Sequence, residues 1–159
     1  MAETTDDIRK MTVEQVMTPE PIVVPPSATV QEMAELMDAN EISGVPVVDV
    51  QGRLLGVVSK TDLLHRCLEG PPGNRDDEVL FWDLLRSASR FSGESSPDAL
   101  GVAEDFMALE PATAKPGDLV GNAAHRMAED RIHRIIVVDD DNHVLGIVTS
   151  LDILKVFPV

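Results

Sequence analysis

Two short stretches of the chain place a hydroxyl residue three positions before an aspartate. Ser59 precedes Asp62 and Thr149 precedes Asp152, and a β-branched run leads into each pair. Such a run predicts a buried strand that leads into a helix N-terminus, where free N–H groups and the helix dipole favour an anion. The hydroxyl can donate to a phosphate, and the carboxylate can accept from ribose hydroxyls. The same spacing is also an N-cap pattern, so both roles stay open.

The two pairs belong to an internal repeat with a constant offset of 90 residues. From Thr12 onward the copies align without a gap, so that Pro21 and Val48, for example, match Pro111 and Val138. An offset this long, present only twice, predicts two copies of a small α/β unit instead of a solenoid. Because one copy is too small to bury both faces of its sheet, we expect the copies to pack with pseudo-twofold symmetry.

Each copy predicts the element order β-α-β-β-α. Apolar periodicity, a capping-box pattern and turn residues indicate these elements. In the first copy we expect a proline-bracketed strand over residues 21–26, a helix over 29–40, strands over 45–48 and 54–58, and a helix over 59–68, with a short helix over 13–17 before them.

Changes in composition predict four segments along the chain. They are an acidic lead over residues 1–11, a first copy over 12–68, a linker over 69–101 and a second copy over 102–159. Within the linker, an acidic start followed by apolar residues predicts one helix that carries Phe81 and Trp82. These two aromatic residues either anchor the linker by packing or form a partner or dimer surface.

The motifs in both copies resemble the CBS motif. The first copy has Ile-Ser-Gly-Val-Pro-Val-Val-Asp over residues 42–49 and Leu-Leu-Gly-Val-Val-Ser-Lys-Thr-Asp-Leu-Leu over 54–64. The second has Ile-His-Arg-Ile-Ile-Val-Val-Asp over 132–139 and Val-Leu-Gly-Ile-Val-Thr-Ser-Leu-Asp-Ile-Leu over 144–154. Two such motifs in tandem resemble a Bateman module. This resemblance implies a non-catalytic regulatory domain with two clefts for adenine nucleotides or adenosyl compounds, and frequent pairing into homodimers.

The resemblance also implies individual ligand contacts. It assigns Ser59 and Thr149 to phosphate, and Asp62 and Asp152 to ribose. The other candidates that it places beside the base or the phosphates are Ile22, Val23, Gly44, Val45, Pro46, Ala112, Thr113, His133, Arg134 and Ile135, and Lys60 is a further candidate because it is next to Ser59. For the aliphatic residues in this set, a plain core role is the alternative.

Basic residues are distributed unequally between the two expected clefts. The second copy has His133-Arg134 where the first copy has Ser43-Gly44. Arg suits bidentate contact with phosphate, although a solvated pair with Asp139 or Asp140 is the alternative. Lys60 beside Ser59 has the neutral counterpart Ser150. We therefore expect the second motif to contribute more to phosphate binding.

The composition argues against several classes of function. The net charge is −15, and the 13 Lys and Arg residues are spread out, which argues against nucleic-acid and anionic-membrane binding. A single cysteine, Cys67, excludes an intramolecular disulfide and a cysteine metal cluster. Residues 139–142 lack the Gly and the distal Glu of an EF-hand and predict a turn. With no apolar run near about 18 residues and a polar, acidic start, a cytoplasmic protein is expected.

The leading hypothesis is a sensor of an adenine-containing ligand that changes module geometry on binding. AMP, ADP, ATP and S-adenosylmethionine are the expected ligands, Mg²⁺ is an optional companion, and no cofactor is obligatory. A homodimer acting on an unknown effector protein is expected. The alternatives are a ligand-independent dimerisation or interaction module for a partner enzyme or transporter, and a divalent-cation sensor. An enzyme is not expected, because no catalytic constellation is present.

Overall fold

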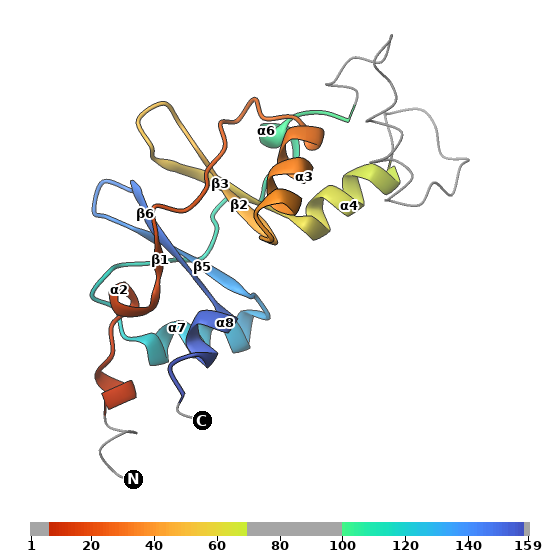
Figure 1. The fold of residues 1–159 in the computed structure, drawn as a ribbon. Helices are drawn as coiled ribbons and strands as arrows, with labels where there is room; N and C mark the ends of the chain where they lie inside the picture. Colours follow the sequence, from red (N-terminus) through yellow and green to blue (C-terminus); the bar gives the residue numbers. More distant parts are fainter. Residues whose placement is uncertain (1–6, 70–99, 158–159) are drawn as a thin grey trace. The chain divides into compact units, whose positions relative to one another are not determined.

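The computed structural model describes residues 7–69 and 100–157, and its architecture is mixed α/β (Figure 1). The predicted fold class is confirmed. The expected linker helix with Phe81 and Trp82 lies outside the described residues. The elements are α2 Val13–Val16, β1 Thr18–Pro19, α3 Val30–Ala39, β2 Gly44–Val48, β3 Leu54–Ser59, α4 Lys60–Glu69, α6 Ala103–Phe106, β4 Thr113–Ala114, α7 Val120–Asp130, β5 Arg134–Val138, β6 Val144–Thr149 and α8 Ser150–Leu154.

Contacts divide the chain into two compact units, each of which draws on both copies of the repeat. Unit 1 comprises Met1–Ile22, Val50–Leu54 and Glu110–Val159. Unit 2 comprises Val23–Asp49 and Leu55–Leu109. Each unit therefore contains the main body of one copy together with the segment that leads into the other copy.

Unit 1 is built on a four-stranded sheet with the order β1-β6-β5-β4. β5 and β6 are antiparallel, β4 runs parallel to β5, and β1 runs antiparallel to β6. Helices α7 and α8 lie together against this sheet (Figure 1). The core between them is aliphatic, and it includes Val13, Ile135, Val137, Val148 and Ile153.

Unit 2 has the same arrangement with shorter edges. Strands β2 and β3 form its sheet, and single bridges join Val24 to Val47 in parallel and Ala108 to Val57 in antiparallel orientation. These bridges occupy the positions that β4 and β1 hold in unit 1. The strand expected over residues 21–26 was therefore too long, because the prolines in that stretch lack the N–H that a ladder needs.

Local signals set the helix starts as predicted. Thr29 and Glu32 form a capping box at α3, in which the Thr29 N–H donates to Glu32 Oε2 at 2.9 Å and the Glu32 N–H donates to Thr29 Oγ1 at 3.1 Å. All five residues of β2 are buried, whereas β3 alternates between buried and more exposed positions. β3 then leads directly into α4, which brings Ser59 to the helix start.

Left-handed backbone recurs at the offset of the repeat. The positive φ angles pair as 48° at Glu20 with 55° at Glu110, 53° at Glu41 with 54° at Arg131, and 81° at Gly52 with 67° at Asn142. A non-glycine residue in this region costs roughly 1–2 kcal/mol. The recurrence at Glu and Arg shows that the fold requires these turns in both copies, whichever residue occupies them.

Candidate functional site

Ser59 and Asp62 bond to each other across the first turn of α4. The Ser59 N–H donates to Asp62 Oδ2 at 2.8 Å, and the Asp62 N–H donates to Ser59 Oγ at 3.2 Å. Both residues are half-buried. This reciprocal arrangement is a capping box, so the capping interpretation of the pair holds in the structure. Neither bond uses Asp62 Oδ1, and the ligand role of the pair stays a prediction.

Thr149 and Asp152 form the matching cap at the start of α8. The Thr149 N–H donates to Asp152 Oδ2 at 2.9 Å, and the Asp152 N–H donates to Thr149 Oγ1 at 3.3 Å. In addition, the Thr149 hydroxyl donates to Asp152 Oδ2 at 3.0 Å. A phosphate that accepted from Thr149 would require this hydroxyl to rotate away from the carboxylate. Lys155 Nζ lies 4.0 Å from Asp152 Oδ1.

Unit 1 gathers most of the second copy's candidate residues at one end of its sheet. Arg134 stands opposite Thr149 in the β5–β6 register, and the Ser150 N–H donates to His133 O at 3.0 Å. On the other side of β5, the Ile136 N–H donates to Ala112 O at 3.0 Å. The start of β5, the end of β6 and the segment before β4 therefore meet beside the N-terminus of α8.

Unit 2 repeats this arrangement with the first copy's residues. The Lys60 N–H donates to Ser43 O at 3.0 Å, and the Val24 N–H donates to Pro46 O at 3.0 Å. The Ser59–Asp62 cap therefore stands beside the start of β2, which begins at Gly44.

The candidate wall residues differ in exposure. Val45 and Ile135 are 0% and 1% exposed, so their side chains belong to the core. Gly44 and Pro46 are buried, whereas Thr113 is half-buried and Val23 is 40% exposed. Ile22 falls in unit 1 and Val23 in unit 2, so the structure divides these two neighbours between units.

The acidic turn after β5 has its own partners. Asp139 Oδ2 lies 3.1 Å from His143 Nδ1, and Lys115 Nζ lies 3.6 Å from Asp140 Oδ1. The backbone N–H of His143 also donates to Asp139 Oδ1 at 2.9 Å. This bond is the largest of the effects that hold the pKa of Asp139 below its ordinary value. The turn that the sequence predicts is therefore present, and Asp139 and Asp140 in it lie beside His143 and Lys115.

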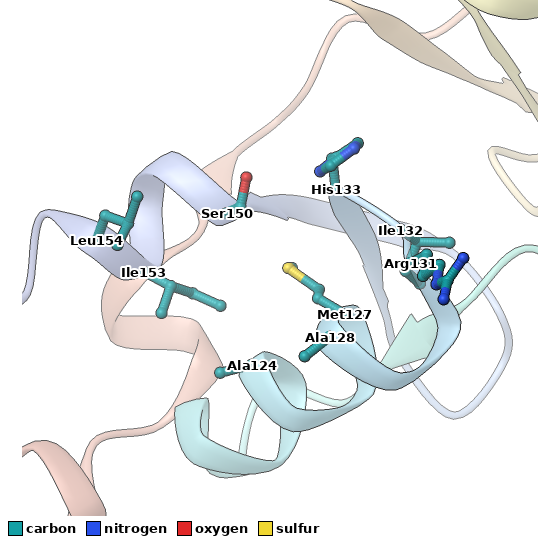
Figure 2. Close-up of a pocket in the computed structure, with 9 residues that line it drawn as sticks. All are labelled: Ala124, Met127, Ala128, Arg131, Ile132, His133, Ser150, Ile153 and Leu154. Carbon is teal, nitrogen blue, oxygen red and sulfur yellow. The ribbon is translucent and has the colours of Figure 1, made fainter.

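An apolar cavity of about 470 Å³ lies between α7 and α8, and Ser150, the residue after the Thr149 cap, is part of its lining (Figure 2). Of the predicted ligand residues, His133 alone lines it. Its lining residues are Ala124, Met127, Ala128, Arg131, Ile132, His133, Ser150, Ile153 and Leu154. The sequence analysis did not predict this cavity, because it depends on how two helices from distant parts of the chain pack together.

Within residues 7–69 and 100–157, no group of three or more His, Cys, Asp or Glu side chains is arranged to hold a metal ion. No helix in that part of the chain is long and apolar enough to cross a membrane.

Burial raises the pKa of the Cys67 thiol, which favours its protonated form.

A protein-family model for the CBS domain matches residues 13–69 and 102–159. The uncharacterized protein MJ1426 of Methanocaldococcus jannaschii is 30% identical over 145 residues, which cover 85% of this chain and 84% of that protein. The chloroplastic CBS domain-containing protein CBSX1 of Arabidopsis thaliana is 29% identical over 140 residues, 84% of this chain. The chain spans 57% of the length of CBSX1.

Some relatives are much longer enzymes. Inosine-5'-monophosphate dehydrogenase of Bifidobacterium longum is 26% identical over 143 residues, which cover 89% of this chain and 21% of the enzyme. Homoserine O-acetyltransferase of Methanocorpusculum labreanum is 32% identical over 140 residues, 88% of this chain and 23% of the enzyme. The likeness to these enzymes is thus confined to less than a quarter of their length.

Solved structures show the same fold. CBSX2 in complex with AMP has 29% identity and a TM-score of 0.68, covering 91% of this chain and 93% of that chain. The CBS domain of a CBS domain-containing membrane protein from Sphaerobacter thermophilus has 28% identity and a TM-score of 0.72, covering 99% and 94%. The CBS domain pair of MJ0100, solved with 5'-methylthioadenosine and S-adenosyl-L-methionine, has 24% identity and a TM-score of 0.70 over 92% and 95%, and supports the fold alone.

Proposed function

The chain belongs to the CBS domain family, and from this premise we propose that it is a non-catalytic regulatory module that binds AMP or a related adenine-containing ligand. The observation that carries the proposal is that each unit has one hydroxyl–aspartate cap. Each cap lies at the end of a sheet, beside the start of a strand. The AMP complex of CBSX2, at 29% identity, supports AMP as the first ligand to test.

In this proposal the cap residues exchange partners when ligand binds. Free N–H groups at the start of α4 favour a phosphate, which a helix N-terminus binds readily. Ser59 and Thr149 donate their hydroxyls to phosphate oxygens, while Asp62 and Asp152 accept from ribose hydroxyls. Arg134 stands opposite Thr149 and places a cation at the site in unit 1. The matching residue in unit 2 is Gly44, which carries no charge. We infer that unit 1 binds phosphate more strongly.

Binding regulates an effector only if the ligand has different affinities for two arrangements of the module. We propose that the working form is a cytoplasmic homodimer that controls an unidentified effector protein, with Mg²⁺ accompanying a polyphosphate ligand. The longer enzyme relatives show that such a module can occupy a small part of a catalytic protein.

One observation favours a second candidate, a ligand-independent interaction module. Leu151 and Leu154 on α8 are 65% and 62% exposed, which is unusual for residues of this size unless a partner covers them. The two candidates are separated by whether nucleotide changes the stability of the protein.

A thermal-shift series with AMP, ADP, ATP and S-adenosylmethionine, each with and without Mg²⁺, tests the proposal. A ligand that binds only the folded chain raises Tm in proportion to its concentration relative to Kd. We expect AMP to raise Tm, Asp152→Ala to reduce the shift by raising the Kd for AMP about tenfold, and Asp62→Ala to reduce it less. If no ligand raises Tm, the nucleotide-sensor proposal fails.

Loss of a cap lowers stability by itself, so a matched control is needed. Glu32→Ala breaks the capping box of α3, which has no proposed ligand role. We expect this variant to lose a similar amount of stability, about 1 kcal/mol, while keeping the full AMP shift. An Asp152→Ala variant that binds AMP as well as Glu32→Ala does would show that the assignment of the ribose contact is wrong.

A further inference from the structure

The cavity between α7 and α8, which we call the α7–α8 cavity, has an apolar end and a basic end. Met127 and Ile153 line it from the two helices and are only 6% and 7% exposed. Leu154 lines the cavity on one side of Met127, whereas Arg131 and His133 line it on the other side (Figure 2). Small-molecule sites have volumes of about 300–1,000 Å³. At about 470 Å³ the cavity is large enough for a ligand with an apolar body and a polar end.

The basic end distinguishes the second copy from the first. At the matched positions, the first copy has Glu41 in place of Arg131 and Asp38 in place of Ala128. None of the nine residues that line the α7–α8 cavity is acidic. The second copy therefore has a guanidinium, and no carboxylate, where the first copy has two carboxylates. In a chain of net charge −15, this local reversal favours an anionic ligand at the cavity.

The cations of this region differ in whether they have partners. On α7, outside the cavity lining, Arg126 pairs with Asp130 at 3.6 Å and His125 pairs with Glu129 at 3.1 Å. Neither of the two basic side chains that line the cavity forms an ion pair or a side-chain hydrogen bond within residues 7–69 and 100–157. Both of these side chains are exposed, so they are available to an anion.

The backbone brings the basic end of the cavity beside the start of α8. Arg131 ends α7 in the left-handed conformation, with φ of 54°, and its N–H donates to Met127 O. The chain leaves the helix at this point, and the Ser150 N–H then donates to His133 O at 3.0 Å. Backbone bonds thus fix the segment that carries both basic side chains at the edge of the cavity.

We propose that the α7–α8 cavity binds an aliphatic carboxylate, with its chain against Met127 and Ile153 and its carboxylate at Arg131 and His133. A guanidinium suits bidentate contact with a carboxylate. A neutral apolar molecule would leave both basic side chains unused, and a short anion would leave the apolar floor uncovered. Because a net charge of −15 argues against docking on an anionic membrane, the ligand is a free acid and not a lipid of the bilayer. The inference does not depend on nucleotide binding at the caps.

Calorimetric titration of the full chain with octanoate, below its micelle concentration, tests the proposal. We expect octanoate to bind, octanol to bind about tenfold more weakly because it lacks the charged head group, and acetate to give no signal over the same concentrations. If octanol or acetate bound as tightly as octanoate, the assignment of an aliphatic carboxylate would be wrong. A wild-type chain that does not bind octanoate overturns the site itself.

Two variants place residues of the first copy in the cavity. Arg131→Glu and Ala128→Asp introduce the residues found at Glu41 and Asp38, and Glu41 has φ of 53°, so the fold accommodates both changes. We expect each variant to raise the Kd for octanoate about tenfold, because a carboxylate then faces the head group. Arg126→Glu is the matched control, with the same charge change on α7 outside the cavity lining. In physiological salt it should change the Kd less than about twofold. An equal loss in all three variants would indicate a general charge effect and overturn the site.

Methyl NMR locates the bound acid within the chain. Octanoate should shift the methyl signals of Met127 and Ile153 and leave that of Met37 unchanged. Met37 is the matched residue of the first copy and is 1% exposed. Equal shifts at Met37 and Met127 would show that the acid acts as a nonspecific detergent. A Met127 signal that moves on dilution of the protein, and not with octanoate, would show that a second copy occupies the cavity instead. Either result overturns the proposal.

Discussion

Units 1 and 2 share a backbone plan and differ at its edges. Both pair a central antiparallel hairpin with a parallel segment on one side and an antiparallel segment on the other. In unit 1 these edge segments are two-residue strands, and in unit 2 they are single bridges. The helix that follows the central hairpin has 5 residues in unit 1 and 10 in unit 2. The two units thus share one backbone plan, while the lengths of their edge segments and of this helix differ.

The side chains at the expected ligand ends differ in the same way. Each unit has a hydroxyl–aspartate cap, but the cation beside it differs. Unit 1 has Arg134 where unit 2 has Gly44, and unit 2 has Lys60 where unit 1 has Ser150. The turn after the middle strand shows a similar substitution, with Asp139 and His143 in the second copy where the first has Asp49 and Arg53. The comparison teaches that the acids that cap a helix or close a turn are retained in both copies, whereas the basic residues beside them differ.

The largest expected effect comes from the two matched glycines that the sheet edges cover. A Cβ at Gly56 would lie 2.8 Å from Ala108 O, and a Cβ at Gly146 would lie 2.9 Å from Thr18 O. Since backbone oxygens must move in both cases, Gly56→Ala and Gly146→Ala should each lower the free energy of unfolding by about 1–3 kcal/mol in urea titrations. A cost confined to one of them would break the equivalence of the two edges.

Gly121→Ala is the control for this pair. Nothing lies within 4 Å of a Cβ at Gly121 in α7, so alanine should be neutral or stabilise the helix by up to about 1 kcal/mol. Destabilisation by this variant would mean that close packing does not explain the effect at Gly56 and Gly146.

A smaller effect is expected from the cations of the two proposed ligand ends. Loss of a charge-assisted contact costs roughly 1.5 kcal/mol or more, so Arg134→Ala should raise the Kd for AMP about tenfold in calorimetric titrations. Lys60 is exposed, and Lys60→Ala should raise it only a few-fold. Lys115→Ala, which removes a unit-1 cation bonded in a turn, should leave AMP binding unchanged. Equal losses for Arg134→Ala and Lys60→Ala would show that the two ends are equivalent.

The smallest expected effect is the pH response of the turn in the second copy. Because bonds from His143 lower the pKa of Asp139 below 3.8, the charged carboxylate stabilises the fold above that pH. This contribution is lost as pH falls through the lowered pKa. Asp139→Asn should therefore lower Tm at neutral pH by circular dichroism, and the difference from wild type should vanish in acid. Asp49→Asn is the matched variant in the first copy. If its Tm difference from wild type changed with pH in the same way, the response would belong to both turns.

The sequence alone determined the features that depend on near neighbours in the chain. The constant offset established the repeat, Thr29 with Glu32 predicted the cap of α3, and the β-branched runs predicted β2, β3, β5 and β6. The same local spacing predicted that Ser59 with Asp62, and Thr149 with Asp152, meet at helix starts. Short-range patterns carry this information because both partners lie within one turn of helix or one strand.

Only the tertiary structure decided which distant segments meet. The pairing of Thr18 with Ile147, and of Ala108 with Val57, joins residues far apart in sequence through backbone groups that have no side-chain signature. The single bridge at Val24, between prolines, is too short to show a period, which is why residues 21–26 were predicted as a longer strand. The α7–α8 cavity likewise joins residues 124–133 to residues 150–154, and no local pattern encodes that contact.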